Sequence, residues 1–469
     1  MQATHDLHFP ASNSTRSGFP QPRLFPIAPS PQEQSTATMP LKILIVGAGV
    51  AGPALAFLLQ RADPLHHITV IERASALRAT GLQLDFKAQG MPIVRKMGLL
   101  DAMRAHRVDE TGAEVVGAKG ESLARYGIRG DSGTEGVHSG GVTNELEIMR
   151  GDMVKVIVDA SIADRKKLEE SGGRGGGLKY VFGTSVKGVV QKEGEGVDVT
   201  FQDGREESFD LVVGADGQNS RTRKMVFGDE VSRESFKELG SQVAYFNVPR
   251  AETDGTLARM FFAAQSRAIL VRNGGRPQTQ VYLFSQENME KTKASYGKPV
   301  AEQKAVWEET FTGAGWQTER FLEGMQTADD FYAHQLAQVK LPALYKGRVV
   351  LIGDAGYCPS VMTGKGTTSA FIGAYVLAGE LARQAPNVDA ALGSYNEVMK
   401  EPVKLAQIIS GNVSLPSSSL AVWCIRNGLW AASSLGIDKL VMRLMPEQKD
   451  EKELGGWPLP EYPELNLAE

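Results

Sequence analysis

The chain has few of the features that would give it a covalent framework, a charged binding surface or a metal centre. Only 2 of its 469 residues are cysteine, so disulfides are excluded as the basis of its stability, and a reducing, cytoplasmic location is expected. Its 51 basic and 55 acidic residues nearly cancel, which argues against binding to nucleic acid or to an anionic membrane. Its 7 histidines are scattered, and no spacing typical of a metal site is present.

The two ends of the chain differ in composition from its middle. Residues 1–40 are rich in Pro, Ser, Thr and Gln, which predicts a disordered leader. They contain no secretory signal, but Arg16 and Arg23 leave a transit peptide open. Residues 406–469 are predicted to form a C-terminal helical segment. Arg426 interrupts its most apolar stretch, so we expect no membrane span; a helix lying on a membrane is open, but packing on the protein is favoured.

The middle of the chain opens with a strand, a helix and a strand that three glycines join. Short apolar runs, typical of buried parallel strands, flank a helical pattern within residues 42–72. Gly47 permits a tight turn, Gly49 lets a pyrophosphate approach the backbone, and Gly52 lets helix and strand pack closely. Glu72 ends the second strand, 72 − 47 = 25 positions after Gly47, where a carboxylate can accept hydrogen bonds from a ribose. The unit therefore predicts a dinucleotide site.

Two further acids follow apolar runs much later in the chain. Asp216 and Asp354 each end such a run. Carboxylates at the carboxyl ends of parallel strands face the crevice where open α/β sheets bind ligands, although either acid could instead cap the next helix. A glycine-rich turn at 364–368 opens a long helix predicted over 366–384. The N-terminus of that helix can stabilise negative charge on a ligand.

Strand patterns fill the regions between these motifs. Residues 178–213 contain three strand-like runs joined by turns, which predicts a β-meander that returns to the first sheet. Residues 146–162 have helical spacing. Residues 235–335 contain longer, aromatic-rich runs with hairpin-like spacing. They predict an antiparallel sheet in a second domain, with aromatic residues that line a pocket or pack in the sheet's own core.

The three motifs together resemble those of the single-component, class A FAD-dependent monooxygenases, which share the fold of para-hydroxybenzoate hydroxylase. The resemblance covers about residues 41–405 and is greatest to the branch of tetracycline-inactivating and fungal secondary-metabolite monooxygenases. It implies an α/β fold: a Rossmann-type, GR2-like FAD-binding domain interleaved with an antiparallel-sheet substrate domain, and C-terminal helices. The implied FAD-binding domain comprises residues 41–80, 140–230 and 336–405, and the implied substrate domain comprises residues 81–139 and 231–335.

The resemblance also implies how this chain would hold FAD. Glu72 would bind the adenosine ribose with Arg73 beside it, and Arg150 would reach the ribityl-phosphate region. Asp354 would bind a hydroxyl on the ribityl or pyrophosphate side, and backbone N–H groups after residue 363 would face the pyrimidine ring, where reduced flavin is anionic. The predicted cofactor-binding residues are Gly47, Gly49, Gly52, Glu72, Arg73, Gly81, Arg150, Asp216, Asp354, Gly364, Gly366 and Thr367.

The chain departs from the family pattern at three positions near the expected flavin ring. Many relatives have a histidine where this chain has Tyr357, and many have an arginine where it has Asn247. We therefore assign no catalytic acid or base. Cys358 lies in the same segment; covalent attachment of the flavin through it is open, but a packing role is favoured.

The implied activity is that of an FAD monooxygenase dependent on O2 and on NADPH or NADH. It would hydroxylate or oxidatively rearrange an apolar aromatic or polycyclic secondary metabolite through a flavin C4a-hydroperoxide. No second dinucleotide fingerprint is present, so the nicotinamide cofactor would bind transiently. The alternatives are a reductase or halogenase of the same fold and a non-catalytic flavoprotein. Trp316 and Trp457 stand apart, which argues against the Trp-x-Trp-x-Ile-Pro signature of halogenases.

Overall fold

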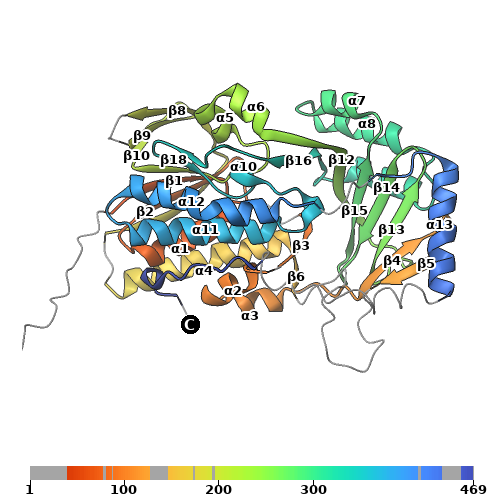
Figure 1. Cartoon of the computed structure of the whole chain (residues 1–469), viewed down its shortest axis with the longest axis horizontal. Coiled ribbons are helices and arrows are strands. Elements are labelled where there is room, and N and C mark those ends of the chain that lie inside the picture. Colours follow the sequence, from red (N-terminus) through yellow and green to blue (C-terminus); the bar gives the residue numbers. More distant parts are fainter. Residues whose placement is uncertain are drawn as a thin grey trace, which may run out of the picture. The chain divides into compact units, whose positions relative to one another are not determined.

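The computed structural model describes residues 40–77, 81–86, 88–126, 146–172, 175–192, 196–409, 414–435 and 456–467 (Figure 1). The predicted disordered leader, apart from Pro40, lies outside these residues. No helix within these ranges is both long and apolar enough to cross a membrane.

A six-stranded sheet contains the strands that precede all three predicted motifs. Its order is β17-β18-β11-β1-β2-β7, and every neighbouring pair is parallel except β17 and β18. The carboxyl ends of β1, β2, β11 and β18 therefore lie at one edge, which brings the glycine motif and the predicted acids to the same side. The strands are β1 (Lys42–Val46), β2 (His67–Glu72), β7 (Gly177–Phe182), β11 (Leu211–Gly214), β17 (Tyr345–Lys346) and β18 (Val349–Leu351).

Both faces of this sheet are buried. Ile43 and Ile45 of β1 belong to a core formed with helices α1, α4, α11 and α12. Within this core, α1 packs against α11, and α11 packs against α12 (Figure 1). Leu44 and Val46 belong to a second core with the sheet β10-β9-β8. A strand covered on both faces needs no polar position, which explains its unbroken apolar run. The elements are α1 (Ala51–Ala62), α4 (Arg150–Glu170), α11 (Gly366–Arg383), α12 (Val388–Ala406), β8 (Val186–Lys192), β9 (Gly196–Phe201) and β10 (Glu206–Phe209).

A seven-stranded sheet follows the order β16-β12-β15-β14-β13-β4-β5. The predicted antiparallel pairing is confirmed for β12 with β15, β14 with β15, and β13 with β14. An added pair, β13 with β4, is parallel. The strands are β4 (Gly112–Val116), β5 (Ser122–Tyr126), β12 (Phe236–Pro249), β13 (Leu257–Ala263), β14 (Arg267–Arg272), β15 (Gln278–Ser285) and β16 (Tyr332–Val339).

The two faces of the seven-stranded sheet have different surroundings. Phe246 and Phe261 belong to a core with helices α8 (Val300–Phe311) and α9 (Thr318–Thr327). Tyr245 and Tyr282 belong to the opposite face, where Leu82 packs against them. Because side chains alternate along a strand, the aromatic-rich runs form a core on one face and a second surface on the other.

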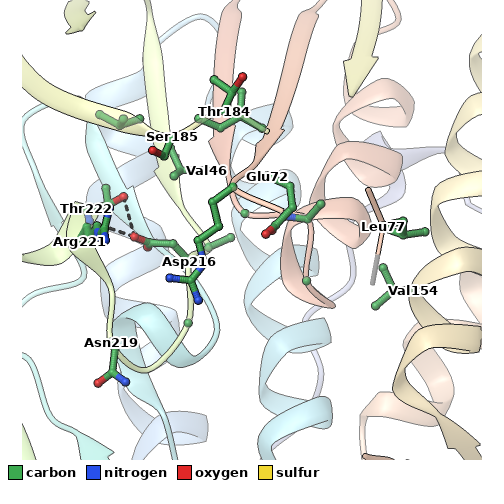
Figure 2. Close-up of a pocket in the computed structure, with 18 of the residues that line it drawn as sticks. Val46, Glu72, Leu77, Val154, Thr184, Ser185, Asp216, Asn219, Arg221 and Thr222 are labelled. Atoms are coloured by element: carbon green, nitrogen blue, oxygen red, sulfur yellow. Dashed lines mark hydrogen bonds between the residues drawn. The ribbon is translucent and has the colours of Figure 1, made fainter. Parts of the chain in front are cut away.

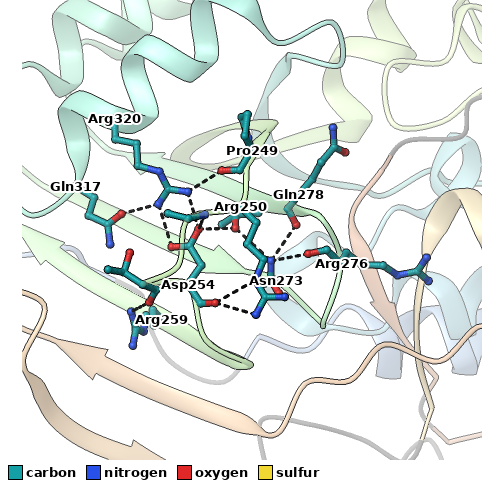
Figure 3. A network of polar contacts seen from close by, with 12 residues as sticks. Pro249, Arg250, Asp254, Arg259, Asn273, Arg276, Gln278, Gln317 and Arg320 are labelled. Carbon is teal, nitrogen blue, oxygen red and sulfur yellow. Dashed lines mark hydrogen bonds and ion pairs between the residues drawn. The ribbon is translucent and has the colours of Figure 1, made fainter.

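A buried carboxylate fixes the connection between β12 and β13 (Figure 3). Asp254 is 4% exposed and accepts hydrogen bonds from both terminal nitrogens of Arg320, at 2.9 and 2.6 Å, and from the Thr279 hydroxyl at 2.7 Å. Burial raises the pKa of Asp254, but these bonds outweigh it and hold the pKa below its ordinary value. Asp254 thus links Arg320 of α9 to Thr279 of β15, and its role is structural.

The remaining elements connect the sheets. The C-terminal helix α13 packs against β5 and β13, in agreement with the favoured prediction, although Leu420, Trp423 and Trp430 remain exposed on it. These elements are β3 (Gln83–Asp85), β6 (Glu147–Met149), α2 (Gly90–Lys96), α3 (Leu100–Ala105), α5 (Arg221–Phe227), α6 (Asp229–Ser235), α7 (Met289–Ser295), α10 (Asp354–Tyr357), η1 (Val361–Thr363), α13 (Ser419–Ser434) and η4 (Pro463–Leu465).

Two predictions of local structure were wrong in part. The helix predicted from residue 146 begins at Arg150, because residues 147–149 form β6, which pairs with β3. The predicted meander over 178–213 contains only β8, β9 and β10, because β7 pairs with β2 in parallel and belongs to the six-stranded sheet. An alternating apolar pattern predicts that a segment forms a strand, but it does not predict with which other strand that segment pairs.

Candidate functional site

The turn after β1 has close contacts that only glycine permits. Gly47 has a φ of +116°, and a Cβ there would lie 2.5 Å from the carbonyl oxygen of Ala215. A Cβ on Gly52 would lie 2.0 Å from the carbonyl oxygen of Gly47. A Cβ on Gly49 would lie 3.3 Å from a terminal guanidinium nitrogen of Arg150. Gly47 and Gly52 therefore shape the turn, and Gly49 leaves room beside an arginine.

A pocket of about 180 Å³ opens beside this turn, at the carboxyl ends of β1, β2 and β11 (Figure 2). We call it the glycine-turn pocket. Gly52 lies outside its lining. The predicted residues that line it are Gly47, Gly49, Glu72, Arg73, Arg150 and Asp216. The polar residues that sequence reasoning missed are Thr184, Ser185, Asn219, Arg221 and Thr222. The position of Thr184 and Ser185 just after β7 is the signal that could have found them.

Glu72 lies at the end of β2 and is held by backbone N–H groups. Its two carboxylate oxygens accept hydrogen bonds from the N–H of Ala48 at 3.2 Å and of Ala74 at 3.0 Å. The first bond ties the acid to the glycine turn itself. A carboxylate oxygen has more than one lone pair, so Glu72 retains acceptor capacity for a ribose hydroxyl in the pocket.

Asp216 lines the same pocket, but its carboxylate also caps the next helix. It accepts hydrogen bonds from the N–H and hydroxyl of Thr222 at 3.0 and 3.1 Å (Figure 2), and from the Ser220 hydroxyl at 2.5 Å. The capping role that the sequence left open is thus present. Any ligand contact of Asp216 would use its remaining lone pairs.

Arg150 is one of two residues that line both this pocket and a second one. It opens α4, its backbone N–H donates to the Leu82 carbonyl at 2.8 Å, and its side chain is half-buried. Gly81 has a φ of +152°, and a Cβ there would lie 3.0 Å from the Arg150 Cβ. Among the residues that the structure describes, the Arg150 guanidinium has no hydrogen bond or ion pair. A half-buried cation without a partner is suited to an anionic ligand.

The second pocket has a volume of about 480 Å³ and lies on the tyrosine-bearing face of the seven-stranded sheet. We call it the sheet pocket. This volume is in the range typical of small-molecule sites. Arg73 and Arg150 line both pockets. The other residues that line the sheet pocket are Gly81, Leu82, Tyr245, Phe246, Asn247, Gln280, Val281, Tyr282, Asp329, Asp330, Phe331 and Tyr332.

Asp354 and the start of α11 lie outside the lining of both pockets. Asp354 is exposed at its surface, but the loss of hydration from the surrounding protein raises its pKa, while the Cys358 thiol and the positive charge of Arg150 act in the opposite direction. Gly364 is in the left-handed conformation, with a φ of +63°, and α11 begins at Gly366 without an acid in its first turn. The first N–H groups of an α-helix have no acceptor within the helix, so those of Gly366 and Thr367 are suited to an electron-rich ring.

Two of the three residues that depart from the family pattern, Tyr357 and Cys358, have packing roles; the third, Asn247, lines the sheet pocket. Tyr357 is 1% exposed, and its hydroxyl occupies the space beside α11 where a Cβ on Gly373 would lie, 1.6 Å away. Its ring is thus turned into the core and does not replace a catalytic histidine. Cys358 is buried, and burial raises the pKa of its thiol well above the ordinary value. A neutral, buried thiol is a poor nucleophile, which disfavours covalent flavin attachment.

The described residues fit the FAD that the sequence resemblance implies. The glycine-turn pocket combines a helix N-terminus with the free guanidinium of Arg150, and both favour a pyrophosphate. Glu72 retains acceptor capacity for a ribose, and the N-terminus of α11 offers N–H groups without a competing acid. These groups all belong to the edge where β1, β2, β11 and β18 end.

Comparisons with known proteins agree with this arrangement. The model of the FAD binding domain family matches residues 40–401. An FAD-dependent monooxygenase of Sarocladium schorii is 42% identical over 434 residues, which cover 92% of this chain and 100% of the relative. A monooxygenase of Cercospora beticola is 33% identical, over 86% of this chain and 96% of its own. The crystal structure of the tetracycline destructase Tet(51) matches with a TM-score of 0.68 and 27% identity, over 90% of this chain and 100% of its own.

The geometry and the comparisons support one assignment. The glycine turn, the acid after β2 and the free arginine suit FAD, the family match spans most of the chain, and close relatives along its whole length are monooxygenases. The chain belongs to the FAD binding domain family and is an FAD-dependent monooxygenase.

Proposed function

We propose that this monooxygenase oxidises a planar aromatic or polycyclic secondary metabolite in the sheet pocket, with NADPH or NADH as electron donor. The main observation in support of the proposal is a row of tyrosines on the face of the seven-stranded sheet that borders the sheet pocket. Tyr245 lies opposite both Tyr282 and Tyr332 in the strand registers. The Tyr245 ring centroid is 5.2 Å from that of Tyr282 and 4.8 Å from that of Tyr332.

These tyrosines form a broad, uncharged wall. Burial raises the pKa of Tyr282, and it raises the pKa of Tyr245 well above the ordinary value, so both phenols are neutral at physiological pH. Aromatic rings attract other aromatic rings by stacking and edge-to-face contact. The wall therefore favours a flat, apolar substrate.

The cofactor-side residues would hold FAD so that its ring reaches this wall. We infer that Glu72 binds the adenosine ribose, that Arg150 and the start of α1 bind the pyrophosphate, and that Gly364, Gly366 and Thr367 face the pyrimidine ring. When bound and reduced, FAD supplies the electrons that activate O2. Because Arg150 lines both pockets, the chain's own residues join the cofactor site to the substrate wall and exclude water between them.

The relatives support the class of substrate. The structural neighbour Tet(51) is named a tetracycline destructase, and tetracycline is a polycyclic compound. The sequence contains no second dinucleotide fingerprint, which supports transient binding of the nicotinamide cofactor. The two cysteines are both free, which supports a reducing, cytoplasmic location.

The proposal is tested with the FAD-loaded enzyme and a panel of planar phenols and polycyclic ketones. We expect at least one compound to raise the rate of NADPH or NADH oxidation about tenfold or more, and to gain one oxygen atom by mass spectrometry. The matched control omits O2: product that still forms without O2 would identify a reductase. Stimulation only by non-aromatic compounds would contradict the proposed substrate class.

A further inference from the structure

The wall of the sheet pocket carries a row of polar side chains beside the tyrosines. Strand register places Gln280 of β15 directly opposite Asn247 of β12 and Arg272 of β14. Paired residues of neighbouring strands point to the same face. These three side chains therefore lie in one row, two residues along the strands from the row of Tyr245 and Tyr282.

Two members of this row already have partners. The Asn247 side-chain amide donates to Asp330. Arg272 donates to Glu110 at 2.9 Å and to Glu147 at 3.0 Å. Each of these two side chains therefore already uses at least one donor within the protein.

In the side-chain amide of Gln280, the oxygen has hydrogen-bond partners but the nitrogen has none among the described residues. Its oxygen accepts hydrogen bonds from the backbone N–H of Gln83 at 3.0 Å and from the Tyr282 hydroxyl at 3.0 Å. A backbone N–H can only donate, so the oxygen and nitrogen of this amide cannot exchange places. The nitrogen, which carries two donor hydrogens, has no acceptor among the residues that the structure describes.

A buried donor without an acceptor costs free energy, about 1–3 kcal/mol. Gln280 is 4% exposed and its nitrogen is screened from solvent, yet the residue lines the sheet pocket. Because no water-sized atom reaches this nitrogen in the structure, a ligand oxygen would supply the acceptor that the described residues lack only when the side chains that cover the nitrogen move aside on binding. The bonds from Tyr282 and Gln83 hold the amide oxygen in place, so little side-chain entropy of Gln280 itself would be lost on binding.

We propose that the free amide N–H of Gln280 holds a carbonyl or phenolate oxygen on the ring system of the substrate and so determines which oxygenated aromatic compounds bind. This inference rests on the proposed function of the sheet pocket. The proposed hydrogen bond adds a polar contact to the aromatic wall. The tyrosines favour a flat ring, and Gln280 favours a ring that carries an oxygen atom at one position.

The test compares two tricyclic probes of the same skeleton, 9-fluorenone and fluorene, which differ by one carbonyl oxygen. Their affinities for the FAD-loaded full chain are measured by equilibrium dialysis. We expect the preference of the wild type for fluorenone over fluorene to fall about tenfold in Gln280→Met, which has no donor. The matched control is Gln242→Met on β12, outside the lining of the sheet pocket, which should retain the preference because the Gln242 amide donates to the Glu287 carbonyl and accepts from the Tyr296 hydroxyl.

A second measurement on the wild type alone covers the case in which Gln280→Met does not fold. The carbonyl stretch of bound fluorenone, recorded by infrared difference spectroscopy, should lie at lower frequency than that of fluorenone in an apolar solvent. If Gln280→Met binds both probes with the same preference as the wild type, or if the carbonyl stretch is unshifted, the proposed role of Gln280 is overturned. The proposed function of the sheet pocket would still stand in either case. If neither probe binds the wild type, the aromatic pocket itself is contradicted.

Discussion

Gly52→Ala is expected to destabilise the fold by about 3 kcal/mol and to weaken FAD binding at least about 100-fold. The added Cβ would lie 2.0 Å from the carbonyl oxygen of Gly47, which is far inside van der Waals contact. Relief requires α1 to move away from the turn after β1. That movement would displace the N–H groups that we propose bind the pyrophosphate. Urea unfolding and titration of the apoprotein with FAD measure the two effects separately.

Gly428→Ala is the matched control for this substitution. Gly428 also lies within a helix, α13, but a Cβ there would meet nothing within 4 Å. Alanine has the higher helix propensity, so this variant should be as stable as the wild type or more stable by up to about 1 kcal/mol. A Gly52→Ala protein that unfolds and binds FAD like the wild type would show that α1 does not need its close approach to the turn.

Arg150→Met is expected to weaken FAD binding about 100-fold while leaving the stability of the apoprotein nearly unchanged. The guanidinium lies beside Gly49 and lines both pockets, but it has no polar partner within the described ranges. Its removal should therefore cost a charge-assisted contact to the cofactor, about 3 kcal/mol, and no hydrogen bond or ion pair among the described residues; the one interaction lost there is its electrostatic effect on Asp354. Methionine retains a long apolar stem for packing against Gly81.

The control for Arg150→Met lies on the same helix. Lys155 pairs with Asp159 at the surface of α4, away from the lining of both pockets, so Lys155→Met should bind FAD within about twofold of the wild type. FAD affinity is measured by quenching of flavin fluorescence, and apoprotein stability by urea unfolding. If Arg150→Met loses stability but keeps its FAD affinity, Arg150 is a structural residue.

The cofactor side of the site was accessible from the sequence because its signals are local. Gly47, Gly49 and Gly52 lie close together in the sequence, and Gly52 makes its closest contact with Gly47 itself. Asp216 and Asp354 were placed by the rule that ligands lie beyond the carboxyl ends of parallel strands. The rule places a residue but does not state what its carboxylate contacts, and only the structure shows that Asp216 caps α5.

The substrate side was not accessible from the sequence because its signals are not local. The run that contains Tyr245 and Phe246 indicates a strand, but the two residues point to opposite faces. Which face becomes core depends on where α8 and α9 pack, and these helices follow more than 50 residues later in the chain. The free amide of Gln280 depends in the same way on strand β3, about 200 residues earlier.

We propose that FAD lies along the edge of the six-stranded sheet, from Glu72 past Arg150 to the start of α11. An experimental structure of the FAD-loaded protein tests this placement most directly. The ribose hydroxyls of the adenosine should lie within hydrogen-bonding distance of Glu72, the pyrophosphate beside Arg150, and the pyrimidine ring at the backbone N–H groups of Gly366 and Thr367. A cofactor that contacts neither Glu72 nor Arg150 would contradict the account.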